Sequence, residues 1–123
     1  MSAKVLVIDD EAVICRFFQR ILTTMGYEVS TASGGREGLA EIKRNPPDLL
    51  FLDIRMPSMD GLECLRGARK IKRTLPIVMI TGFGDLDSAQ EAMRLGADEY
   101  ISKPFDLQEI RRLIGELLGE TSP

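Results

Sequence analysis

Histidine is absent from this sequence of 123 residues. A histidine-based catalytic triad, a histidine metal ligand and self-phosphorylation on histidine are therefore excluded. Cysteine is nearly as scarce: the wide spacing of Cys15 and Cys64 forms neither a disulfide framework nor a metal-binding pattern. We expect both to be buried free thiols in a reducing compartment, and hence a cytoplasmic protein.

The sequence also lacks an apolar run long enough to span a membrane, and residues 1–4 show no signal-peptide pattern. It lacks a basic stripe as well, and its net charge is -3, so a surface that binds nucleic acid is not expected. The densest basic cluster, at residues 66–73, is interpreted as the solvated face and end of a helix. We accordingly expect neither a membrane nor a nucleic acid among the partners of this domain.

What the sequence does contain is an alternation of short apolar runs with amphipathic segments, at a length that suits one domain with a single core. Strands are predicted at residues 4–9, 27–31, 48–53, 77–81 and 99–102, each followed by a helix. These strand–helix units imply an α/β fold with a doubly wound parallel sheet covered on both faces. Residues 1–119 are expected to form this domain, and residues 120–123 a tail or the start of a linker.

Capping residues and helix breakers mark the ends of the predicted helices. The expected N-caps are Ser33, Asp85 or Asp87, and Asp106. The Asn-Pro-Pro segment at residues 45–47 ends the second helix, because proline cannot continue it. The last helix should bury a stripe of apolar side chains that begins at Leu107.

Polar side chains close most of the predicted strands. Asp9 and Asp10 follow the first strand, Asp53 ends the third, Thr81 ends the fourth and Lys103 follows the fifth. In a doubly wound sheet the carboxyl ends of the strands converge on one crevice, where ligands bind. Each of these residues alone has a simpler explanation as a cap or a surface charge. Their joint occurrence favours a common site.

Four motifs, at residues 7–11, 52–61, 80–82 and 100–105, occur in an order and spacing that are highly specific together. Through them the sequence resembles a response-regulator receiver domain of bacterial two-component signalling, of the chemotaxis-regulator type, over essentially its whole length. The resemblance implies a flavodoxin-like fold of five strand–helix units, with a parallel sheet of strand order 2-1-3-4-5. It also implies a signalling domain, with no enzymatic activity beyond self-phosphorylation from small donors and slow self-dephosphorylation.

The resemblance further implies that Asp53 accepts a phosphoryl group from a sensor histidine kinase, a histidine phosphotransferase or a small phosphodonor. The implied cofactor is Mg²⁺, held by the side chains of Asp10 and Asp53, by the backbone carbonyl of Arg55 and, through water, by Asp9. Elementary electrostatics agrees with a cation here. Carboxylates about 5 Å apart repel by roughly 3 kcal/mol per pair at an effective dielectric constant near 20.

Thr81 and Lys103 are implied to hold the phosphoryl oxygens, and the Lys103–Pro104 peptide bond is expected to be cis. Thr81 and Tyr100 are implied to form a switch, in which the aromatic ring turns inward when the threonine moves. The implied output surface comprises the fourth helix, the last strand and the last helix, and it binds a downstream target or a second copy of the chain. Arg55 and Phe83 occupy positions that vary in the family and flank the site.

Two other families use a similar architecture. A Mg²⁺-dependent phosphatase of the haloacid dehalogenase type also has an Asp nucleophile after an apolar strand, but the position of its second carboxylate is taken here by Arg55. A flavodoxin-like FMN-binding protein needs a loop after the first strand that cradles phosphate, whereas Asp10 and Glu11 would repel it. Both alternatives are therefore disfavoured.

Overall fold

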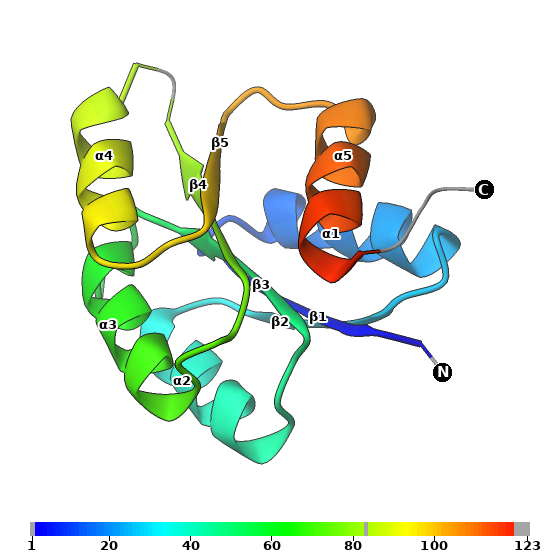
Figure 1. The fold of residues 1–123 in the computed structure, drawn as a ribbon, viewed down its shortest axis with the longest axis horizontal. Coiled ribbons are helices and arrows are strands. Elements are labelled where there is room, and N and C mark those ends of the chain that lie inside the picture. Colours follow the sequence, from blue (N-terminus) through cyan, green and yellow to red (C-terminus); the bar gives the residue numbers. More distant parts are fainter. Residues whose placement is uncertain (1, 83, 120–123) are drawn as a thin grey trace.

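The computed structural model describes residues 2–82 and 84–119, so that Phe83 and the predicted tail at 120–123 lie outside the described residues. Strands and helices alternate along the chain (Figure 1). In order they are β1 (Lys4–Ile8), α1 (Ala12–Thr24), β2 (Glu28–Ala32), α2 (Gly35–Arg44), β3 (Leu49–Asp53), α3 (Gly61–Ile71), β4 (Ile77–Thr81), α4 (Leu86–Arg94), β5 (Glu99–Ser102) and α5 (Leu107–Leu118). None of the helices in this described part is both long and apolar enough to cross a membrane.

The five strands form one sheet of order β2-β1-β3-β4-β5, and every neighbouring pair is parallel. The predicted fold class and strand order are thereby confirmed. From β1 the chain adds β2 on one side and then returns to place β3 on the other side of β1. The direction of winding therefore reverses between β1 and β3, and the carboxyl ends of these two strands border the crevice typical of such a reversal.

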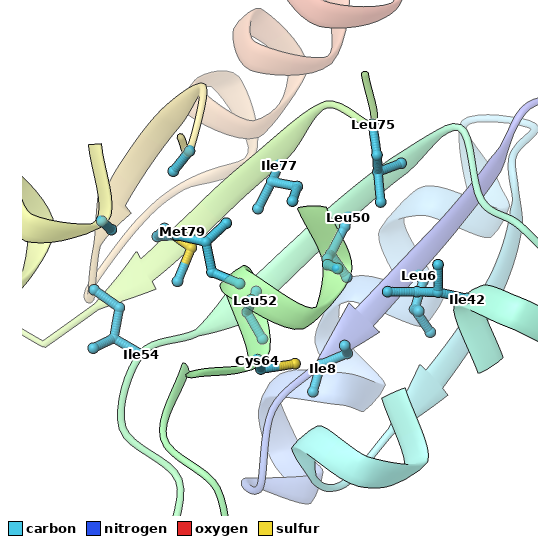
Figure 2. Close-up of a cluster of buried hydrophobic side chains, with 14 of the residues drawn as sticks. Leu6, Ile8, Ile42, Leu50, Leu52, Ile54, Cys64, Leu75, Ile77 and Met79 are labelled. Carbon is cyan, nitrogen blue, oxygen red and sulfur yellow. The ribbon is translucent and has the colours of Figure 1, made fainter. Parts of the chain in front are cut away.

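Helices cover both faces of the sheet, with α1 and α5 on one face and α2, α3 and α4 on the other (Figure 1). Successive strand residues point to opposite faces, so Leu6 and Ile8 pack under α2 and α3 (Figure 2), while Val5 and Val7 pack under α1 and α5. All four side chains are completely buried. This two-sided burial explains why the central strands read as continuous apolar runs.

Some local predictions are corrected by the structure. Ser33 is not the N-cap of α2, because that helix begins at Gly35 with Gly34 as its N-cap. The start of α2 packs so closely that an added Cβ at Gly35 would lie 2.6 Å from the sulfur of Met59. Leu107, expected to face the core, is the first residue of α5 and is 36% exposed.

The two cysteines differ in their environments. Both are free thiols as predicted, but only Cys64 is buried, whereas Cys15 is half-buried. The Cys15 thiol donates to the backbone oxygen of Asp9 at 3.4 Å. Burial raises the pKa of both thiols, that of Cys64 to about 12, so neither is a reactive thiolate at neutral pH.

The basic cluster of α3 is not only a solvated face, because Arg69 is a structural anchor. Its guanidinium donates to the backbone oxygen of Gly96 at 2.9 and 2.7 Å and to that of Leu75 at 2.5 Å. It also pairs with Asp98 at 2.9 Å, and Asp98 in turn accepts from the backbone N–H of Ile77 at 2.8 Å. These contacts fasten α3, the start of β4 and the connection from α4 to β5 to one another.

Candidate functional site

Three carboxylates gather where β1 and β3 end. Asp9 and Asp10 directly follow β1, and Asp53 is the last residue of the neighbouring parallel strand β3. One carboxylate oxygen of each residue lies within 4.8 Å of those of the other two. Asp9 and Asp53 are buried, whereas Asp10 is exposed at the mouth of the cluster. The cluster is thus open to solvent on one side and closed by the sheet on the other.

One carboxylate oxygen of Asp9 is buried without a hydrogen-bond partner. Its Oδ1 accepts from the backbone N–H of Glu11 at 2.8 Å. Its Oδ2 is the single buried side-chain oxygen or nitrogen of the described residues that has no hydrogen-bond partner. Buried acceptors are nearly always paired in folded proteins, so this atom leaves room for a donor or a cation.

Burial and mutual repulsion disfavour the ionised form of these acids. Burial and then the charge of Asp9 raise the pKa of Asp53 to about 7, against the opposing effect of Lys103. Burial is also the main cause that raises the pKa of Asp9. A positive ion between the carboxylates would remove this penalty, because opposite charge at short range favours ionisation.

Lys103 reaches the cluster from the segment after β5. The Lys103–Pro104 bond is cis, as predicted, and the backbone N–H of Lys103 donates to the backbone oxygen of Thr81 at 2.8 Å. The ammonium group lies 2.6 Å from Oε1 of Glu11 and 3.6 Å from Oδ2 of Asp9. Burial works against its charge, but Glu11 and the aspartates outweigh burial and raise the pKa of Lys103. The lysine is therefore held as a cation beside the carboxylates.

Thr81 ends β4 and is buried, with its hydroxyl turned to the neighbouring strand. The hydroxyl donates to the backbone oxygen of Ile101 at 3.2 Å and lies 3.2 Å from the hydroxyl of Ser102. Tyr100, on the same strand β5, has 36% of its surface exposed. In this arrangement the Thr81 hydroxyl is engaged with β5, and the Tyr100 ring faces partly outward.

Arg55 belongs to the connection between β3 and α3, and its backbone N–H donates to Oδ1 of Asp53 at 3.3 Å. Its exposed side chain lies instead at the start of α4. Nε donates to Oδ2 of Asp85 at 3.0 Å, and Nη2 lies 3.5 Å from the hydroxyl of Ser88. Asp85 is at the N-cap position of α4 as predicted, but its side chain makes no capping hydrogen bond. The guanidinium instead takes this carboxylate and lowers its pKa.

The sequence between residues 5 and 115 matches the family model described as the response regulator receiver domain. The chain belongs to this family. It is accordingly a phosphoacceptor domain of two-component signalling, as the motifs predicted. The family assignment also removes the support for a dehalogenase-type phosphatase or an FMN-binding protein.

Relatives of this receiver domain include sporulation initiation phosphotransferase F of Bacillus subtilis (strain 168), which is 34% identical over 118 residues, 96% of this chain and 95% of that protein. The probable transcriptional regulator ycf27 of Pyropia yezoensis is 40% identical over 115 residues, which are 94% of this chain and 47% of that protein. The receiver thus spans about half the length of such regulators.

Solved receiver structures have the same fold. The receiver domain of NtrX from Brucella abortus matches with a TM-score of 0.89 at 36% identity, covering 95% of this chain and 99% of that one. A response regulator receiver domain protein from Clostridium thermocellum matches with a TM-score of 0.90 at 39% identity, covering 95% of this chain and 94% of that one. The receiver domains of two-component systems work with histidine kinases or phosphotransferases, and they generally bind Mg²⁺ at an acidic pocket of this kind.

Gly61 brings α3 against the backbone beside the acidic cluster of this receiver. Its N–H donates to the backbone oxygen of Ile54 at 2.6 Å. A Cβ at this position would lie only 2.2 Å from the backbone oxygen of Asp53, so glycine is required for the close approach. Asp60 caps the helix by accepting from the N–H of Glu63 at 2.9 Å. The start of α3 therefore packs directly against the backbone at the end of β3.

Sequence reasoning did not identify two of the partners at this site. Glu11 was known only as a further acid after β1, yet it holds the ammonium group of Lys103 across 92 positions of the sequence. Asp85 was predicted as a helix cap, and its pairing with Arg55 was not expected. The sequence did contain one indication of these pairs: Glu11 and Asp85 follow strands of the sheet at the same edge as Lys103 and Arg55.

Proposed function

We propose that Asp53 is the phosphoacceptor of this receiver domain. A carboxylate oxygen of Asp53 attacks the phosphorus of the donor, the bond from phosphorus to the donor breaks, and the leaving group departs with that electron pair. The donor is the phosphohistidine of a sensor kinase or phosphotransferase, or a small molecule such as acetyl phosphate. The observation that carries this proposal is the position of Asp53, buried at the end of the central strand, among the carboxylates of Asp9 and Asp10.

Mass spectrometry of the intact protein tests the proposal directly. Incubation with Mg²⁺ and acetyl phosphate should add a single phosphoryl group, and digestion should place it on the peptide that contains Asp53. Labelling confined to another peptide would contradict the assignment.

We propose that Mg²⁺ is held by the side chains of Asp10 and Asp53 and the backbone carbonyl of Arg55, with Asp9 contributing through water. The oxygen-rich donor set suits this hard cation, which retains several water molecules. Oδ2 of Asp9 has no hydrogen-bond partner and only a long ion pair of 3.6 Å with Lys103, which supports a further polar or cationic occupant. When bound, Mg²⁺ supplies positive charge that neutralises the carboxylates and the phosphoryl oxygens.

Asp10→Asn should weaken Mg²⁺ binding by at least tenfold, because a charged oxygen ligand at the mouth of the cluster is lost. The same change should slow phosphorylation by acetyl phosphate and relieve repulsion in the metal-free protein. Isothermal titration calorimetry gives the affinities, with Asp48→Asn, at the opposite end of β3, as the control. Equal affinities for Asp10→Asn and the wild type would show that Asp10 is not a ligand.

Lys103 and Thr81 are proposed to bind the phosphoryl oxygens after transfer. Lys103 supplies a positive charge that already lies beside Asp9, and Thr81 supplies a hydroxyl donor from the adjacent strand end. Charge-assisted hydrogen bonds of this kind are stronger than neutral ones. We propose that the domain serves as a signalling acceptor that turns over no other substrate and slowly loses its own phosphoryl group.

The output surface is proposed to lie on α4, β5 and α5. Among the described residues, the large apolar side chains that are exposed are Val13, Phe17, Leu86, Met93, Tyr100 and Leu107. Most of these lie on the three output elements, with exposed fractions of 52% for Leu86, 38% for Met93 and 36% for Tyr100. A surface with this apolar content suits a downstream target or a second copy of the chain.

Thr81→Ala should allow phosphorylation of Asp53 but uncouple it from this surface. In the unphosphorylated form the hydroxyl is bonded to β5, and a phosphoryl group gives it a reason to move. Without the hydroxyl, alanine cannot bond to the phosphoryl group, and the room available to Tyr100 no longer depends on phosphorylation, so the two states differ less in energy. Amide NMR spectra with and without beryllofluoride, which mimics a phosphoryl group, measure the response of residues 85–95 and Tyr100.

The control for this experiment is Thr74→Ala, which removes an exposed threonine before β4. It should leave the beryllofluoride response unchanged. Shifts in Thr81→Ala as large as those in the wild type would contradict the proposed switch.

A further inference from the structure

Arg55 links two parts of the molecule that the proposed function treats separately, one through its backbone and the other through its side chain. Its backbone N–H contacts the carboxylate of Asp53 at 3.3 Å, and its guanidinium contacts Asp85 at the start of α4 at 3.0 Å. A hollow of about 390 Å³ lies beside this link, lined among others by Asp10, Arg55 and Ser88. Arg55 therefore connects Asp53, through its backbone, with the start of α4, through its ion pair.

We propose that Asp85 is a positioning residue for the acceptor: it holds the guanidinium of Arg55 at the start of α4, and a phosphoryl group on Asp53 draws this cation away. The inference rests on the proposed role of Asp53. It adds a route to α4 that does not pass through Thr81.

The ion pair between Arg55 and Asp85 is weak enough for the guanidinium to exchange Asp85 for another partner. The Arg55 side chain is 75% exposed, whereas that of Asp85 is 16% exposed. Nε of Arg55 donates to Asp85, and the contact of its Nη2 with Ser88 is long at 3.5 Å. Water around the guanidinium screens the pair, so its contribution to stability is modest. The guanidinium thus has unused donors while it is bound to Asp85.

A phosphoryl group offers this guanidinium a better partner. It adds about −1.5 to −2 charges and three acceptor oxygens next to a residue whose backbone is already in contact with Asp53. The planar guanidinium can donate to two of these oxygens at once. Before phosphorylation the ammonium group of Lys103 is the cation found beside the buried carboxylates, and Arg55 is left to Asp85.

Release of Arg55 has a direct consequence for α4. Asp85 occupies the N-cap position, and its carboxylate loses the partner that fixes it. The carboxylate then becomes free to accept from the backbone N–H groups at the start of the helix, as Asp residues at this position commonly do. The start of α4 therefore has two arrangements, selected by the charge on Asp53.

Asp85→Asn should raise the apparent affinity for beryllofluoride in the presence of Mg²⁺ about two- to fivefold, which matches the strength of a solvent-screened ion pair. The amide resonances of residues 88–94 in the free variant should shift toward their positions in the beryllofluoride-bound wild type. Asp85→Glu, which keeps the charge, should restore values close to those of the wild type. Asp87→Asn, which removes a charge from the same turn of α4, should change neither quantity.

The decisive comparison repeats Asp85→Asn in an Arg55→Gln background. If Asp85 acts through Arg55, its substitution has no further effect on beryllofluoride affinity there. An equal gain in both backgrounds, or no gain in either, would overturn the positioning role. This outcome differs from failure of the proposed function, in which the wild type itself shows no beryllofluoride-dependent shift at Asp53.

Discussion

Asp53→Asn should retain no stable phosphoryl group after incubation with Mg²⁺ and acetyl phosphate, whereas the wild type gains one. The substitution keeps the size and shape of the side chain but replaces the nucleophilic carboxylate with an amide. The neighbouring acids are poor substitutes. Asp9 is fully buried and has one oxygen bonded to the N–H of Glu11, and Asp10 lies exposed at the mouth of the cluster.

The measurement is intact-mass spectrometry over a time course, with Asp48→Asn as the matched control. Asp48 precedes the same strand at its other end, where its carboxylate accepts from the backbone N–H of Lys4 at 2.8 Å. This control should be labelled like the wild type. Stoichiometric labelling of Asp53→Asn on a different residue would mean that the acceptor has been misassigned.

The metal-free protein should lose stability as the pH rises from about 4 to about 7, and Asp53→Asn should remove much of this loss. Burial and the charge of Asp9 raise the pKa of Asp53 from 3.8 to about 7. Between these values the folded state binds a proton that the unfolded state has released, so the free energy of unfolding falls with increasing pH. The stabilising contribution is complete below the pKa of Asp53 in the unfolded state, and it is lost as the pH rises through the pKa of Asp53 in the folded state.

Urea unfolding in EDTA at pH 4 and pH 8 measures this effect. We expect Asp53→Asn to raise the free energy of unfolding by about 1–2 kcal/mol at pH 8, a value limited by water at the mouth of the cluster, which screens the repulsion. At pH 4 the gain should be much smaller, because Asp53 is then protonated in the folded wild type. Saturating Mg²⁺ at pH 8 should stabilise the wild type by mass action and reduce the difference. A gain that is equal at both pH values would instead indicate a packing effect.

The pattern of apolar runs was sufficient to predict a parallel sheet with Asp9, Asp10 and Asp53 at its carboxyl edge, whereas the strand order that makes β1 and β3 neighbours came from the resemblance to receiver domains. Strands buried on both faces leave long apolar runs, and the polar residue that ends each run is then visible in the sequence. Parallel pairing brings the carboxyl ends of neighbouring strands to the same edge, so the position of Asp53 relative to Asp9 follows from topology.

The partners of the long charged side chains could not be predicted in this way. Arg69, at the foot of α3, was placed on a solvated face, yet it donates to backbone oxygens beyond α4. Lys103 lies 2.6 Å from Glu11 and 3.6 Å from Asp9, and Arg55 pairs with Asp85. No sequence spacing encodes such choices among partners. Ser33 was a reasonable cap by residue type, but α2 begins at Gly35 with Gly34 at the N-cap position.

The anchor formed by Arg69 determines how α4 can move. It fixes the chain just beyond the C-terminal end of the helix through Gly96 and Asp98, whereas the N-terminal end is linked to the connection between β3 and α3 by the ion pair of Arg55 and Asp85. The C-terminal end of α4 is therefore the more firmly anchored of its two ends, and it lies away from Asp53. With nine residues it is about 13 Å long, so a tilt of about 10° displaces the free end by about 2 Å. If phosphorylation releases the pair of Arg55 and Asp85, we expect Leu86 in the first turn of α4 to move further than Met93 near the anchored end, so the first turn is where a partner would detect the change.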